Sequence, residues 1–269
     1  MTICSAGHSG LYYPQDPSSL ASEAAPMERI ECRFPKALLL PHAAWSHCLP
    51  LLHHGLAHTR GLEAPLIVLL APYHGVGKNL PVMVPKSDAL AVGNTTIPFA
   101  TDVRAHLASR FPLTVSDTPF EDESSWELLM PLIASYHPDV PILPILSSEL
   151  TGEHRLLYAS LLAQIHSLWP SALYIVTSNA NEMLPSPKAE ADAIAFRTSL
   201  TAPVTGGHAP LSACNQSALA ALARQQWAGD ARWRIIAQMC ERVIYDEIPS
   251  SLDIEERHVW HITALLEES

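Results

Sequence analysis

Short, nearly continuous apolar segments constrain the fold of this chain more than any other feature. They occupy residues 36–40, 65–71, 140–146 and 172–177, and stretches with helical periodicity lie between them. An apolar segment of this length, without alternating polar positions, is typical of a strand buried on both faces of a parallel sheet. The alternation predicts an α/β protein: a single domain over residues 1–269, with a central, mostly parallel or mixed sheet flanked by helices.

Composition and charge exclude several classes of function. Hydrophobic residues make up 48% of the chain and charged residues 16%, which is enough apolar material for a large core. The formal net charge of −11 disfavours binding to nucleic acid. The longest apolar run, residues 64–72, is too short to span a bilayer, and the first residues do not resemble a signal peptide. We therefore expect a cytoplasmic protein with neither nucleic acid nor membrane as a partner.

Two histidines follow the first two apolar segments directly. His42 comes after residues 36–40, and His74 comes after residues 65–71. In a parallel sheet, ligand sites lie beyond the carboxyl ends of the strands, so neighbouring strands could bring both imidazoles to one point. Two converging imidazoles make a metal site or an acid/base site. The alternative is that strand ends are common positions for some of the 14 histidines of the chain.

Other polar positions allow a functional interpretation, but a structural one is the commoner case for each. Cys214 lies near a predicted helix start, where the helix dipole lowers the pKa of a thiol, although a buried and inert cysteine is the commoner case. Residues 123–136 show one helical pattern whose acidic start can simply complement the helix dipole. The histidine-rich stretch 47–58 is interpreted as a solvated helix face. The stretch 75–79, GVGKN, lacks the remaining residues of a phosphate-binding loop, so no nucleotide cofactor is expected.

Several motifs, taken in order, resemble those of the Memo family, a member of the bacterial and archaeal AmmeMemoRadiSam grouping. GHSGLYYPQDP is similar to the opening AGxFYPxDP signature of the family, and LLPHAAW is similar to its PHAGY motif. LAPYH matches GPSHH at the first histidine, ESSWE resembles EHSxE, and IVTSN stands where the family has a strand ending in SSD. These motifs begin at residues 7, 39, 70, 123 and 175. The resemblance covers most of the chain.

The resemblance implies a fold and a site. The family is similar in fold to the class III extradiol dioxygenases, which hold Fe(II) with two histidines and a carboxylate. Carried over to this sequence, the metal ligands are His42, His74 and Cys214. A set of two imidazoles and a thiolate suits a divalent transition metal: iron, copper or zinc. The other implied positions are Glu182 and Asn179 as catalytic residues, and His8, Ser124, Glu127 and Tyr73 as residues lining the pocket.

The sequence departs from the family pattern around the implied ligands. Ser124 replaces a histidine, Asn179 an aspartate, Glu182 a histidine, Asn215 a glycine, and Gly75 the second histidine of GPSHH. Residues around a metal fix the orientation and tautomer of its ligands, so these changes imply a different reaction or none.

Three functions therefore remain open. The first is a metal-dependent, dioxygenase-like oxidoreductase that acts on an unknown small molecule. The second is a non-catalytic relative that binds a peptide or protein, with partners of the AmmeMemoRadiSam grouping among the expectations. The third is a metal-dependent hydrolase, which the absence of an HExxH motif disfavours.

Overall fold

The computed structural model describes residues 1–17, 35–75, 82–202, 213–228, 231–243 and 256–268. Its strands are β1 (Ile3–Ser5), β2 (Ala37–Leu40), β3 (Ile67–Pro72), β4 (Met83–Val84), β5 (Ala89–Val92), β6 (Thr95–Pro98), β7 (Thr114–Val115), β8 (Ile142–Ser147), β9 (Leu173–Thr177), β10 (Leu184–Pro185), β11 (Ala231–Val243) and β12 (Arg257–Glu268). Its helices are α2 (Trp45–Ala57), α3 (Thr101–Ala108), α4 (Thr118–Asp122), α5 (Ser124–Glu127), α6 (Met130–Tyr136), α7 (Gly152–Leu168), α8 (Ser186–Thr201), α9 (Gln216–Ala223) and the 3-10 turn η1 (Gln226–Ala228). None of the helices in these ranges combines the length and the apolar character needed to cross a membrane.

A mixed sheet forms the centre of the molecule. Its strand order is β10-β12-β2-β9-β3-β8-β4-β7, and β11 pairs with β12. The four strands at its middle, β2, β9, β3 and β8, are parallel to one another, whereas β12 joins β2 in the antiparallel sense. A second, small sheet has the order β1-β5-β6. The predicted α/β class, with a mixed sheet flanked by helices, is thus confirmed.

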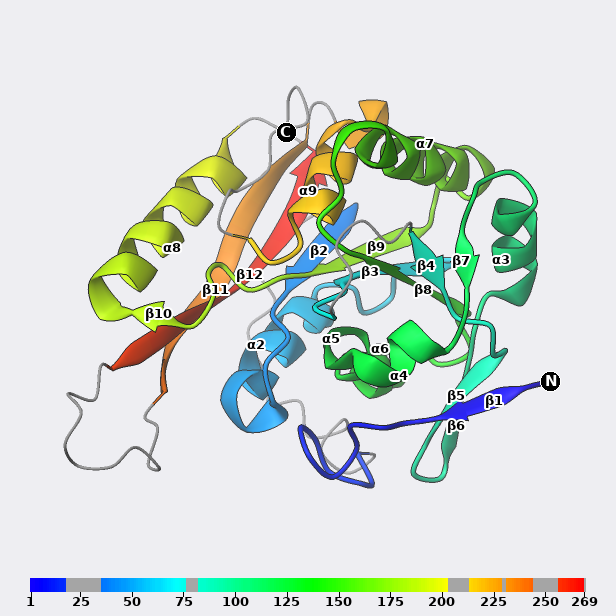
Figure 1. Ribbon diagram of the computed structural model, residues 1–269, viewed down its shortest axis with the longest axis horizontal. Coiled ribbons are helices and arrows are strands. Elements are labelled where there is room, and N and C mark those ends of the chain that lie inside the picture. The colour runs from blue at the N-terminus through cyan, green and yellow to red at the C-terminus, as the bar shows by residue number, and fades with distance from the viewer. Residues whose placement is uncertain (18–34, 76–81, 203–212, 229–230, 244–255, 269) are drawn as a thin grey trace.

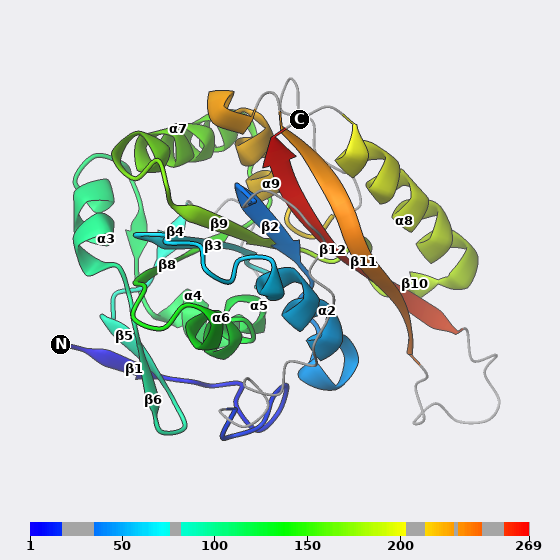
Figure 2. The same cartoon turned by 180° about the vertical axis from the view of Figure 1, so that it is seen from behind.

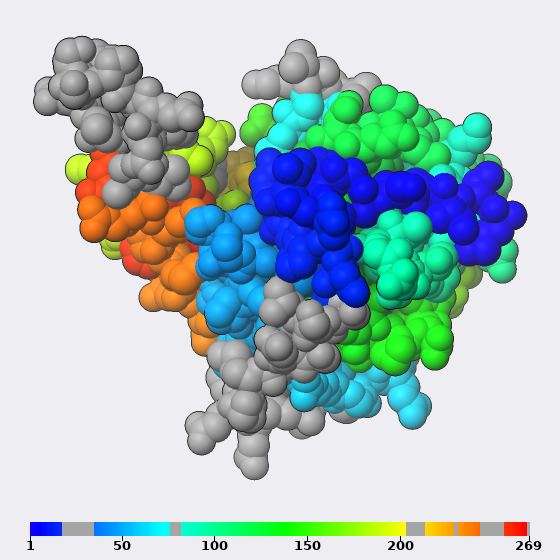
Figure 3. Space-filling model, turned by 90° about the horizontal axis from the view of Figure 1, so that it is seen from below, coloured from blue at the N-terminus to red at the C-terminus, as the bar shows by residue number. Residues whose placement is uncertain are grey.

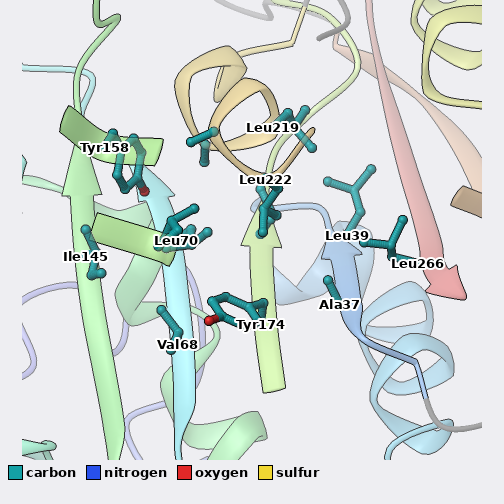
Figure 4. Packing of buried hydrophobic residues seen from close by; sticks show 14 of the residues in the cluster. Ala37, Leu39, Val68, Leu70, Ile145, Tyr158, Tyr174, Leu219, Leu222 and Leu266 are labelled. Atoms are coloured by element: carbon teal, nitrogen blue, oxygen red, sulfur yellow. The ribbon is translucent and has the colours of Figure 1, made fainter. Parts of the chain in front are cut away.

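The central strands are buried on both faces, and this explains their continuous apolar sequence. Ala37 and Leu39 belong to one core cluster, whereas Leu38 and Leu40 belong to the other. The same alternation divides β3 and β9, because successive side chains of a strand point to opposite faces of a sheet. Figure 4 shows the first cluster, in which the strand residues pack against Tyr158 of α7 and the leucines of α9.

Helices cover the two faces of the sheet in separate groups. Residues of α3, α7, α8 and α9 belong to the first cluster, and residues of α2, α4, α5 and α6 belong to the second. Figures 1 and 2 show this arrangement, with the long hairpin of β11 and β12 at one side of the sheet and α8 packed along it. The order of layers is therefore helix, sheet, helix.

Two expectations about helices were wrong. The pattern over residues 123–136 forms two helices, α5 and α6, because Pro131 occupies the first turn of α6 and cannot continue a preceding helix. Of the histidines in the histidine-rich stretch only His47 is exposed, whereas His53, His54 and His58 are 6%, 9% and 1% exposed, so most of it is not a solvated face. Helix α2 packs against β2, β11, β12 and α6, so only part of its circumference reaches solvent.

The N-terminal segment is tied to the body of the protein by hydrogen bonds. β1 pairs with β5, and the Trp45 backbone amide donates to the Tyr12 carbonyl at 2.9 Å. Figure 3 shows this segment lying across the surface beside α2. The first residues of the chain are thereby brought close to the start of α2 and to α5.

Candidate metal centre

The site lies at the carboxyl ends of the parallel strands. His42 follows β2, His74 follows β3, and Cys214 precedes α9. One ligand atom from each of the three side chains can be chosen so that all lie within 4.8 Å of one another. The two imidazole rings are 5.5 Å apart between centroids. The strands that carry them are not neighbours, because β9 runs between β2 and β3, and the imidazoles meet over its end.

His42 is held by residues at the end of β9 and just after it. Its Nδ1 lies 2.8 Å from the Thr177 hydroxyl oxygen, and its backbone amide donates to Asn179 Oδ1 at 3.3 Å. The other ring nitrogen, Nε2, lies 3.4 Å from Cys214 Sγ. The ring is thus fixed through Nδ1 and presents Nε2 to the centre of the cluster.

His74 is held by a single buried carboxylate. Glu123 accepts the His74 backbone amide at 2.7 Å, and the same oxygen lies 3.0 Å from His74 Nδ1. Hydrogen bonds with Cys214 and Glu123 raise the pKa of His74 to about 10, although burial opposes the change. Burial would raise the pKa of Glu123, but the contacts with His74 outweigh it and lower the pKa to about 2.

Cys214 is surrounded by groups that stabilise a thiolate. The backbone amide of Asn179 donates to Sγ at 3.1 Å, and the Ser178 hydroxyl lies 3.5 Å from it. Burial acts to raise the pKa of Cys214, but the charge and hydrogen bonds of His42 and His74, with Ser178, lower it to about 5. A thiolate is the form in which cysteine binds metals.

Asn215 fixes the loop that carries Cys214. Its side-chain amide donates to the carbonyls of Leu70 and Thr177, both at 3.1 Å. Asn215 thereby bridges β3 and β9 at the edge where the site forms. The sequence showed this position only as a departure from a family glycine, because its partners are backbone carbonyls far away in the chain.

A cavity of about 600 Å³ opens beside the three candidate ligands. Of the other residues predicted for the site, Asn179, Glu182 and Tyr73 line it, and Glu182 is exposed. Lys188 at the start of α8 also belongs to its wall. That Asn179 and Glu182 act in catalysis stays a prediction.

Three residues predicted to line the pocket are not among those that line this cavity: His8, Ser124 and Glu127. Ser124 is the first residue of α5. Glu127 is 1% exposed and accepts the backbone amides of Gly7 and His8, both at 2.9 Å. Glu127 also accepts the hydroxyl of Tyr13 at 2.7 Å, so its role in the structure is to hold the N-terminal segment.

The donor set of the cluster fits a transition metal. Each histidine has Nδ1 beside an oxygen, from Thr177 or Glu123, which is how histidine ligands of metals are usually oriented. Two ligands at about 2.0 and 2.3 Å from one ion, near the tetrahedral angle, lie roughly 3.5 Å apart, and the distance between His42 Nε2 and Cys214 Sγ is 3.4 Å. Within the described ranges, no other group of three or more such side chains converges in this way.

The fold and the cluster together define a class of α/β protein with a candidate mononuclear metal centre at the carboxyl edge of its sheet. Residues 5–195 match the family described as Memo-like protein, so the chain belongs to the Memo-like family. Both histidines lie in the matched part, whereas Cys214 lies beyond it.

The chain was also compared with curated proteins and with solved structures. The comparison with curated proteins gives no match. Among solved structures, the chain is similar to one described as an uncharacterized protein JW3007 from Escherichia coli K12, with 15% identity and a TM-score of 0.48. That similarity covers 86% of this chain and 99% of the other.

Proposed function

We propose that this protein binds one transition-metal ion through His42, His74 and Cys214 and acts on a small molecule that enters the adjoining cavity. The observation that carries the proposal is the convergence of the three ligand atoms, all within 4.8 Å of one another. Iron, copper and zinc all accept two imidazoles and a thiolate.

The surrounding residues support this proposal independently of the ligands themselves. A metal needs neutral imidazoles that present one bare nitrogen and a cysteine that has lost its proton. The contacts of Thr177 and Glu123 fix Nδ1 of each ring, so Nε2 is the nitrogen that can bind; because the pKa of His74 is about 10 without a metal, the ion has to displace a proton from that ring. The low pKa of Cys214, about 5, keeps the thiol ionised at neutral pH.

The bound ion would supply Lewis acidity, and redox chemistry if it is iron or copper. The chain itself supplies the orientation of the ligands and a cavity with both polar and charged groups. Glu182 stands at the cavity wall with an exposed carboxylate, where it can accept a proton from a bound molecule. Lys188, also on the wall, offers a positive charge to an anionic group of the same molecule.

Metal analysis of anaerobically purified protein tests the proposal. We expect close to one ion per chain in the wild type and a loss of stoichiometric metal in His42→Ala, His74→Ala and Cys214→Ser. Cys4→Ser is the matched control, because Cys4 lies on β1 and its thiol donates to the Ala89 carbonyl, away from the cluster. The proposal is contradicted if the wild type holds no metal either as purified or after metal is added back. Full metal content in all three variants contradicts it as well.

A second assay separates catalysis from binding. The metal-loaded protein is incubated with catechol-like substrates under oxygen, and the wild type is compared with Glu182→Gln. Turnover that falls in Glu182→Gln supports the proposed chemistry. Retained metal without turnover of any substrate favours the non-catalytic, binding alternative.

A further inference from the structure

We propose that the C-terminal hairpin positions the candidate metal centre: His261 of β12, braced by Glu241 of β11, holds Asn179, and Asn179 in turn holds His42 and Cys214. This inference rests on the proposed function for its metal readout. Neither His261 nor Glu241 belongs to any sequence motif that points to the site, and both lie beyond the residues matched by the family.

His261 is fixed at both ends of its ring. Its Nδ1 lies 3.1 Å from Asn179 Oδ1, and its Nε2 lies 2.8 Å from Glu241 Oε2. The residue is only 1% exposed, so a rotated ring would leave buried polar atoms without partners. The imidazole therefore has one preferred orientation, and that orientation determines where the Asn179 side chain can lie.

Asn179 transmits this constraint to two of the three candidate ligands. Its Oδ1 accepts the backbone amide of His42 at 3.3 Å, and its own backbone amide donates to Cys214 Sγ at 3.1 Å. The His42 amide can only donate, so the oxygen of the Asn179 amide group must face it. The same oxygen then faces His261 Nδ1, which can donate to it. Because Glu241 Oε2 is an acceptor too, only the imidazolium makes both hydrogen bonds; the Glu241 carboxylate favours that form, whereas burial acts against it and lowers the pKa of His261.

Glu241 connects this arrangement to α2. Its second oxygen, Oε1, lies 3.0 Å from Nδ1 of His47, whose side chain is 47% exposed. One carboxylate thus joins the hairpin, the first turn of α2 and, through His261, the loop after β9. Because these elements meet only in the folded protein, the brace forms together with the site.

The hydrogen bonds around metal ligands have a measurable effect on affinity. Removing one such partner typically lowers metal affinity by about 10–100-fold, because the ligands lose their preferred orientation. His261 touches no candidate ligand directly, so we expect the lower end of this range, about tenfold. A residue that only fills space in the core would change stability and leave this affinity unaltered.

The experiment compares His261→Leu, His261→Gln and Glu241→Gln with a matched control, His258→Gln. His258 lies on the same strand but contacts Cys240 and Glu256 instead of Asn179. Affinity for Co²⁺ or Zn²⁺ is measured by competition with a chromophoric chelator. We expect His261→Leu to weaken binding about tenfold. We expect His261→Gln to recover part of the loss, because its amide can still donate to Asn179, and His258→Gln to match the wild type.

A second measurement needs no metal. Cys214 alkylation by iodoacetamide is followed in metal-free protein at neutral pH by peptide mass spectrometry. Cys214, with a pKa of about 5, is ionised at neutral pH, so a thiolate that loses the Asn179 donor becomes the better nucleophile, and we expect faster alkylation in His261→Leu than in His258→Gln. If the wild type binds no metal, the proposed function fails, and the alkylation rates alone then decide on the brace.

Two results would overturn the brace. One is a folded His261→Leu variant with wild-type metal affinity and a wild-type alkylation rate. The other is an equal loss in His258→Gln. If His261→Leu does not fold, Glu241→Gln decides, because it keeps the shape of the side chain and removes only the charge that orients His261. The brace then predicts weakened metal binding and faster alkylation, and wild-type values for both contradict it.

Discussion

Glu127 offers a sharp test of how the N-terminal segment is attached. Its buried carboxylate accepts the Gly7 amide, the His8 amide and the Tyr13 hydroxyl at 2.7 to 2.9 Å. Burial and the neighbouring Glu127 raise the pKa of Tyr13, so its hydroxyl stays a donor at every ordinary pH. Replacement of Glu127 by alanine leaves these three donors without their acceptor.

The magnitude follows from the number and burial of these donors. A hydrogen bond to a charged group contributes about 1.5–3 kcal/mol, and a buried donor left without a partner costs about 1–3 kcal/mol. We expect Glu127→Ala to lower the free energy of unfolding by about 3–5 kcal/mol, because several donors lose their acceptor together and Tyr13 is only 4% exposed. The loss of stability has an upper limit, because the N-terminal segment can detach and water then satisfies the freed donors. Tyr13→Phe removes one donor only and should lose about 1–2 kcal/mol.

Urea unfolding and hydrogen exchange measure the two consequences. The free energy of unfolding of each variant is compared with that of the wild type, and exchange is followed at the Gly7 and His8 amides. We expect both amides to lose protection in Glu127→Ala and to keep most of it in Tyr13→Phe. A loss below about 1 kcal/mol, with both amides still protected, would show that Glu127 does not hold the segment.

Three further predictions concern the site and the core. Glu123→Gln should weaken metal binding by about 10–100-fold in a chelator competition assay, because a neutral amide orients the histidine beside it less firmly; unchanged affinity contradicts this. Gly55→Ala should lower the free energy of unfolding by about 1–3 kcal/mol, although alanine favours helices by about 1 kcal/mol, because the new methyl group overlaps the buried Leu40 side chain; a more stable variant contradicts the close approach of α2 to the sheet. Burial lowers the pKa of His137 below its unfolded value near 6.5, so its stabilising contribution is complete above that pH and is lost as pH falls through the folded value. The difference in unfolding free energy between wild type and His137→Gln should therefore shrink between pH 7.5 and 5.5, and a constant difference contradicts the assignment.

The central sheet and the positions of two site residues follow from local sequence alone. Residues 36–40 and 65–71 are apolar at nearly every position, and only a strand covered on both faces buries such a segment. Histidines directly after these segments had to emerge at the carboxyl edge of a parallel sheet. Cys214 came from the family resemblance, because its distance in the chain from His42 carries no spatial information.

The other groups that complete the site depend on how the strands and helices pack. Thr177, Asn215 and His261 meet the ligands or their neighbours only because β9 runs between β2 and β3 and because β12 joins β2. Strand order and register determine these contacts, and no local pattern encodes them. Packing likewise decided the surroundings of Glu127 and of the buried α2 histidines, which differ from those expected.

Glu127 and the histidines of α2 illustrate this limit. A helical pattern indicates that a helix forms, but the packing of neighbouring elements decides which parts of its surface remain in water. Glu127 meets the N-terminal segment far away along the chain, at a separation of 120 positions from Gly7. Local sequence thus determined the elements and the strand-end histidines, whereas the assembled sheet decided what surrounds them, because those partners are brought together only by folding.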